Sequence, residues 1–70
     1  MERRIIQNSS NISEIGFDED SSTLEIMFKN NSIYQYFDVP KQVYLELMQA
    51  DSHGKYLANN IKGLYRYSKI

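Results

Sequence analysis

Between Tyr34 and Tyr56 the chain passes from an aromatic, strand-like segment into two helix-like segments through short breaks. Tyr34, Tyr36 and Phe37 are followed closely by Pro40. Proline cannot donate to a strand ladder, and its fixed φ suits the first turn of a helix. This abrupt change predicts an α+β domain in which helices pack on a sheet.

The residues before this segment predict a β-hairpin and a third strand. Apolar and polar residues alternate over 14–17 and 23–29, and residues 18–22 between them favour a turn. A second turn at 30–32 leads into a strand over 33–37. These patterns predict a three-stranded antiparallel β-meander.

The register of the second hairpin depends on the length of its turn. A two-residue turn would place Gln35 opposite Ile26, where its amide would lie among aliphatic core side chains. A three-residue loop, with Asn31 in the left-handed conformation, instead places Tyr34 opposite Ile26. We predict the three-residue loop, which turns Tyr34 and Tyr36 mainly toward the core. The other face then carries a half-apolar candidate interface made of Met27, Ile33 and Phe37.

Two amphipathic helices are predicted after Pro40. Apolar residues recur at helical spacing over 43–50 and, at i, i+4 and i+7, over 57–64. Residues 51–52 end the first helix and offer a cap to the second, which Gly63 is expected to stop. The predicted order is βββαα, with two short α-helices packed on one face of the sheet and the C-terminal tail closing its edge.

The length and composition indicate one small domain. Residues 1–10 lack periodicity and are expected to form a loose lead-in, with residues 11–70 as the single folded domain. A chain of this size buries only about 60% of the surface that its unfolded form exposes. Because it has no cysteine to form a disulfide, homo-oligomerisation is a candidate source of additional stability.

The charge is unevenly distributed along the chain. Residues 1–51 hold all nine acidic residues against four of the eight Lys and Arg residues, a net charge of −5. Residues 52–70 hold the other four cations and no acid, a net charge of +4. A domain polarised in this way can present a basic face to an anionic partner.

This basic region supplies the candidate ligand-binding residues. A glycine at a helix start lets backbone amides approach a phosphate, and the helix dipole and Lys55 favour an anion there. Farther along, cations alternate with tyrosines, a combination that can bind single-stranded nucleic acid. The candidate phosphate or RNA site comprises Ser52, His53, Gly54, Lys55, Tyr56, Lys62, Tyr65, Arg66 and Tyr67. The structural alternatives are a helix cap, close packing at Gly54, tyrosines that fill the core and a solvated basic face.

No sequence pattern supports catalysis, a metal or a cofactor. His53 is the only histidine, and a nearby Asp51 alone does not make a catalytic pair. The acidic residues 18–20 lack a calcium-loop pattern, and neither a Walker motif nor a serine elbow is present. We therefore expect a protein that is not an enzyme.

Two further features bear on location. The absence of cysteine fits a reducing compartment. No apolar run approaches the roughly 18 residues of a membrane span or the form of a signal peptide. We therefore expect a cytoplasmic protein without a membrane partner.

Several spaced elements resemble the KTSC family. They are Tyr34-x-Tyr36, Val39-Pro40, Val43-Tyr44, Ala50-Asp51-Ser52-x-Gly54-Lys55-Tyr56 and Ile61. The resemblance covers about residues 9–67. It implies kinship with a module at the C-terminus of some lysyl-tRNA synthetases and with free-standing bacterial and phage proteins. RNA binding is the function usually suggested for this family, and no defined binding residues accompany that suggestion.

Three hypotheses about function follow. In the first, a non-catalytic module binds RNA or another phosphate-bearing ligand through a region centred on Lys55, Lys62 and Arg66. In the second, an oligomer sequesters a small nucleotide between its subunits. In the third, the outer sheet face makes a protein interaction or oligomerises, and the basic region is incidental.

Overall fold

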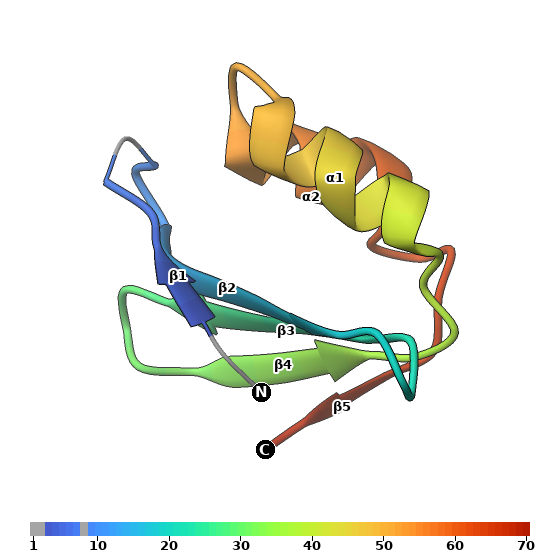
Figure 1. Cartoon of the computed structure of the whole chain (residues 1–70). Helices are drawn as coiled ribbons and strands as arrows, with labels where there is room; N and C mark the ends of the chain where they lie inside the picture. The colour runs from blue at the N-terminus through green and yellow to red at the C-terminus, as the bar shows by residue number, and fades with distance from the viewer. Residues whose placement is uncertain (1–2, 8) are drawn as a thin grey trace.

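The computed structural model describes residues 3–7 and 9–70, and this part of the chain forms one sheet and two helices (Figure 1). The elements in chain order are β1 (Arg3–Ile5), β2 (Ile12–Asp18), β3 (Thr23–Phe28), β4 (Ile33–Tyr36), α1 (Lys41–Gln49), α2 (His53–Asn60) and β5 (Tyr67–Lys69). The strands pair antiparallel in the order β1-β2-β3-β4-β5. Both helices lie on the same face of this sheet (Figure 1).

The α+β class, the antiparallel sheet and the two helices are confirmed, but the prediction of three strands is wrong. Among the described residues the sheet has five. The expected loose lead-in over 1–10 contributes β1, which pairs with residues 14–16 of β2, while residues 1, 2 and 8 lie outside the described part. The C-terminal tail closes the opposite edge as β5. Three-residue strands are too short for alternation to reveal them.

The β3–β4 hairpin has the predicted register. Tyr34 pairs with Ile26, and Gln35 pairs with Glu25. Asn31 has a φ of 68°, the left-handed conformation that the three-residue loop requires. The polar Gln35 therefore stays off the helix-covered face, and its Nε2 donates to the Glu25 carboxylate at 3.0 Å.

The core lies between the helices and the sheet. Within the described part of the chain its buried hydrophobic residues are Ile6, Ile12, Ile15, Leu24, Ile26, Tyr36, Val39, Leu47, Leu57 and Ile61. Leu47 anchors α1 and Leu57 anchors α2 to the sheet. Leu64, which the helical spacing predicts on the same stripe, is instead 69% exposed. The reason is that α2 ends at Asn60 and Gly63, with a φ of 82°, redirects the chain.

Candidate nucleic-acid interface

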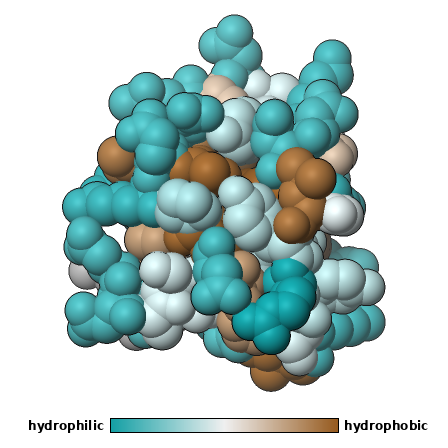
Figure 2. Space-filling model, turned by 90° about the vertical axis from the view of Figure 1, so that its right-hand side faces the viewer, coloured by the Kyte–Doolittle hydropathy of each residue, from teal (hydrophilic) through white to brown (hydrophobic). Residues whose placement is uncertain are grey.

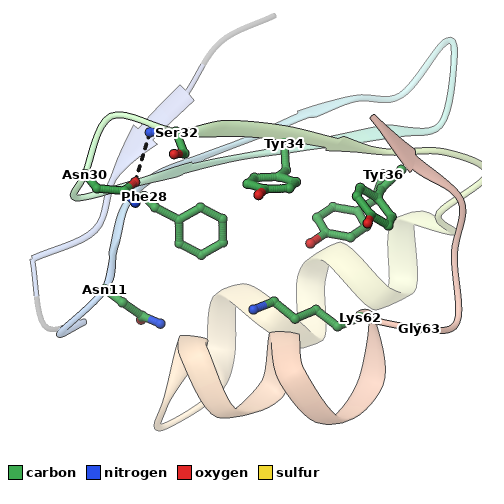
Figure 3. Close-up of a pocket in the computed structure, with 9 residues that line it drawn as sticks. Asn11, Phe28, Asn30, Ser32, Tyr34, Tyr36, Lys62 and Gly63 are labelled. Atoms are coloured by element: carbon green, nitrogen blue, oxygen red, sulfur yellow. Dashed lines mark hydrogen bonds between the residues drawn. The ribbon is translucent and has the colours of Figure 1, made fainter. Parts of the chain in front are cut away.

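A groove of about 610 Å³ opens between the sheet and the end of α2 (Figure 3). Four aromatic side chains line it: Phe28 from β3, Tyr34 and Tyr36 from β4, and Tyr67 from β5. Tyr36 and Tyr67 are register partners, so both project to the same face of the sheet. The groove thus has an aromatic surface assembled from three adjacent strands.

The rings contact one another in sequence across the groove. Phe28 and Tyr34 meet edge to face, with centroids 5.6 Å apart. The Tyr67 ring lies 5.9 Å from the rings of both Tyr34 and Tyr36. Tyr36 is only 3% exposed, whereas Tyr67 is 61% exposed. Tyr67 therefore offers an exposed ring that packs against the buried Tyr36 and the half-buried Tyr34.

Two lysines supply positive charge over these rings. The Lys62 Nζ lies 5.6 Å from the Phe28 centroid, and the Lys69 Nζ lies 5.9 Å from that of Tyr34. Both distances are within the range of cation–π attraction. Among the described residues, those that line the groove include no Asp or Glu. The groove therefore combines stacking surfaces with cations, and its described lining carries no carboxylate.

The phenol of Tyr36 adds no negative charge. Burial raises the pKa of its hydroxyl, and the neighbouring phenols of Tyr34 and Tyr67 raise the pKa further. Tyr36 therefore stays neutral well above physiological pH, and its hydroxyl keeps its proton.

The structure divides the nine predicted site residues between two regions. Lys62 and Tyr67 line the aromatic groove. Tyr65 and Arg66 border a shallow hollow beside it, together with Tyr67 and Phe37.

In the view of Figure 2, apolar surface appears in patches among hydrophilic side chains rather than as one continuous area.

Arg66 is directed toward the loop after β4. Its Nη2 donates to the Asp38 carboxylate at 2.9 Å, and its guanidinium lies 6.0 Å from the Phe37 ring centroid. Both side chains of the ion pair are more than three-quarters exposed. An exposed pair of this kind contributes little to stability, so Arg66 can exchange Asp38 for another anion at small cost.

The residues at the start of α2 form the second region. The Ser52 hydroxyl accepts a hydrogen bond from the Lys55 backbone N–H at 3.3 Å, which caps the helix. A Cβ added to Gly54 would lie 2.9 Å from the Asn11 side-chain oxygen, so glycine permits close packing there. Both observations match the structural alternatives for this motif. His53 and the exposed Lys55 border a hollow that Asn11 also lines.

Tyr56 joins the two helices. Its hydroxyl donates to Glu46 of α1 at 2.8 Å. This hydrogen bond, followed by one from Gln42, lowers the pKa of Glu46. The observed contact gives Tyr56 a structural role between α1 and α2.

Several groove residues were absent from the sequence-based site. They are Asn11, Phe28, Asn30, Ser32, Tyr34 and Tyr36, together with Lys69 above the Tyr34 ring. The predicted register already placed both β4 tyrosines on the helix-covered face. Pairing the tail with β4 would have brought Tyr67 and Lys69 beside them, so the missing information was the position of β5.

The three residues of the candidate interface are not equivalent. Met27 and Ile33 are register partners on the outer face, and both are half-buried. Phe37 lies farther along the chain, against Arg66. On β3, the nearly buried Glu25 carboxylate forms an ion pair with Arg3 of β1.

Within residues 3–7 and 9–70, no group of three or more His, Asp or Glu side chains is arranged to hold a metal ion. In the same part of the chain, neither helix has the length and apolar character needed to cross a membrane.

The sheet, the helix layer and the groove define a small α+β domain with an aromatic, basic surface beside its core. The sequence pattern of the KTSC domain matches residues 8–67. The chain therefore belongs to the KTSC domain family, as the resemblance predicted.

Known relatives include small proteins and one region of a much larger enzyme. An uncharacterized protein from Stutzerimonas stutzeri (strain A1501) is 33% identical over 69 residues, which cover 97% of each chain. A lysine–tRNA ligase from Trichormus variabilis is 38% identical over 59 residues, which cover 84% of this chain but 10% of the ligase. The crystal structure of a KTSC domain protein from Yersinia pestis matches with a TM-score of 0.94 and 38% identity, over 99% of this chain and 96% of that one.

Proposed function

We propose that this KTSC domain is a non-catalytic module that binds single-stranded RNA through the aromatic groove. The observation that carries the proposal is the contact series Phe28, Tyr34 and Tyr67 with Lys62 and Lys69 above the rings. Flat rings and phosphate-binding cations on one surface are the combination by which proteins hold unpaired nucleotides.

The parts of the groove have distinct roles in this proposal. An unpaired base stacks on the exposed ring of Tyr67, which is worth about 1–3 kcal/mol per base. Lys62 and Lys69 neutralise flanking phosphates, and each neutralised phosphate steepens the salt dependence of binding by roughly 0.7 in log–log slope. The volume of about 610 Å³ lies in the range of pockets that hold small organic ligands. The groove therefore suits one or two nucleotides rather than a duplex.

The relatives support RNA as the class of ligand. A lysine–tRNA ligase acts on a tRNA, and a segment of that enzyme is similar to this chain. The similar segment is a tenth of the ligase, so the ligase reaction itself is not part of the proposal.

Fluorescence anisotropy with labelled RNA hexamers tests the proposal. We expect saturable binding that weakens between 50 and 200 mM salt and is reduced by Lys62→Gln and Tyr67→Ala. Lys41→Gln is the matched control, because Lys41 is an exposed lysine paired with Glu19 outside the groove and its loss changes the net charge equally. Lys55→Gln tests the start of α2 separately.

The outcomes distinguish the three hypotheses. If Lys62→Gln and Lys41→Gln reduce RNA affinity equally, the lysines act only through the overall charge, and a groove site is contradicted. Mononucleotides that raise the melting temperature as strongly as the hexamers do would favour nucleotide sequestration. If no hexamer binds and Met27→Asp changes the oligomeric mass, the outer face is the functional surface.

A further inference from the structure

Two asparagines at the rim of the aromatic groove have fixed amide orientations. The Asn30 side-chain oxygen accepts the Ser32 backbone N–H at 3.0 Å, as the dashed line in Figure 3 shows. This contact requires the oxygen, because a backbone N–H can only donate. The Nδ2 of Asn30 is therefore the atom left for other partners.

The orientation of Asn11 follows from the hydrogen bonds of Ser9. The Ser9 Oγ accepts two backbone N–H groups, those of Asn11 at 3.4 Å and Ile12 at 3.1 Å. The Ser9 hydroxyl proton is then free to donate, and the Ser9 Oγ donates to the Asn11 side-chain oxygen at 3.1 Å. That oxygen also lies on the Gly54 side, where it is the atom that an added Cβ at Gly54 would meet first. Asn11 is thus held with its oxygen toward Ser9 and its nitrogen toward the groove (Figure 3).

The rim of the groove therefore presents hydrogen-bond donors, the side-chain nitrogens of Asn11 and Asn30. Neither amide nitrogen makes a hydrogen bond to any of the residues that the structure describes, and both asparagines line the groove. The Lys62 ammonium adds a third donor. A ligand that reaches this rim is favoured when its edge carries acceptors, because an amine placed against these donors is left without a partner.

Resting on the proposed function, we infer that Asn11 and Asn30 make the groove selective for keto bases, uracil and guanine. Uracil presents a carbonyl oxygen where cytosine presents an amine, and guanine presents one where adenine presents an amine. Asn11 and Asn30 lie near Phe28, at the opposite end of the groove from Tyr36 and its register partner Tyr67, so they meet the base next to the one that stacks on Tyr67 (Figure 3). Stacking itself does not distinguish the bases, since every base has a ring face. The discrimination therefore comes from the two amides, while the aromatic rings and lysines supply most of the affinity.

The test compares hexauridylate with hexacytidylate, which have the same length and charge. We expect the protein to bind hexauridylate more tightly by roughly 2- to 12-fold, the effect of one neutral hydrogen bond. Asn30→Asp keeps the oxygen that accepts the Ser32 N–H but replaces the exposed donor with an acceptor. We expect this variant to lower the affinity ratio to one or below.

Asn59→Asp is the matched control, because Asn59 is an exposed residue of α2 that does not line the groove. It adds the same negative charge and should leave the ratio unchanged. If Asn30→Asp does not fold, Asn11→Asp makes the same change at the other amide, again with the internal acceptor retained.

Failure of the inference can be told from failure of the proposed function. Equal binding of the two hexamers, with loss of both in Tyr67→Ala, overturns the base preference and leaves the RNA site intact. Tighter binding of hexacytidylate also overturns the preference. If neither hexamer binds, both the selectivity and the groove function are wrong.

Discussion

Two halves of one sheet face differ in what covers them. In the β2–β3 half, Ile15, Leu24 and Ile26 have no exposed surface. In the β4–β5 half, Tyr34 is half-buried and Tyr67 is 61% exposed, although register places them on the same face. The β2–β3 half supplies aliphatic core residues, whereas the β4–β5 half, together with Phe28 of β3, forms the groove. The aliphatic core and the candidate binding surface therefore lie side by side on one sheet face and meet at β3 and β4.

Helix length and residue chemistry account for this difference. At 1.5 Å per residue, the nine residues of α1 and eight of α2 give helices only about 14 and 12 Å long. Ile and Leu have no polar atom and are most stable under such a cover, whereas tyrosine keeps its hydroxyl near water while its ring packs. The sequence places tyrosines on the strands that the helices leave partly open.

The largest expected effect is on stability, in the covered half. Leu57 of α2 is 1% exposed and packs in the core. Leu57→Ala should lower the free energy of unfolding by about 2–5 kcal/mol, because it removes buried methyl groups and leaves a cavity. Urea denaturation measures this, with Leu45→Ala as the control, since Leu45 is 40% exposed. A cost below about 1 kcal/mol would mean that the helix layer is not the main source of stability.

The next largest effect is expected in the groove, where a substitution should reduce RNA affinity but hardly change stability. Tyr67→Ala should weaken RNA binding by about 1–3 kcal/mol through lost stacking. Because the Tyr67 side chain is mostly exposed, its unfolding free energy should change by less than about 1 kcal/mol. Anisotropy and urea denaturation of the same protein sample check both values. A stability loss as large as that of Leu57→Ala would mean that Tyr67 stabilises the fold as a core residue does, and would contradict the distinction between core and groove.

The β3–β4 pairing was more predictable from the sequence than the groove. The β3–β4 register followed from local signals, because Gln35 disfavours one register and Asn31 supports the other. The groove depends on β5, whose three residues carry too little pattern to show that they pair with β4. The orientation of the Asn11 amide depends on the hydrogen bonds that Ser9 makes, which no spacing rule reveals.

A smaller effect is expected on the opposite, outer face. Arg3 pairs with the Glu25 carboxylate, whose side chain is 8% exposed, and so links β1 to β3 across β2. Arg3→Met should cost about 1 kcal/mol of stability, because a nearly buried carboxylate loses its charged partner while the 30% exposure of Arg3 moderates the loss. Combining it with Glu25→Gln should recover part of that cost, which a double-mutant cycle measures. Strict additivity would contradict the coupling.

The smallest expected effect concerns the helix layer and pH. The Tyr56 hydroxyl donates to Glu46 and lowers its pKa, so Tyr56→Phe should return that pKa toward its ordinary value. A carboxyl whose pKa is lower in the folded state contributes stability above its unfolded pKa and loses it as the pH falls through the folded pKa. The contribution is therefore complete at neutral pH, and the variant should show a shallower loss of stability on acidification. NMR titration of the Glu46 carboxyl carbon measures the shift, with Tyr65→Phe as the control. An unchanged Glu46 pKa would mean that the α1–α2 hydrogen bond does not persist in solution. RNA affinity should be the same in Tyr56→Phe as in the unsubstituted protein, because Tyr56 does not line the groove.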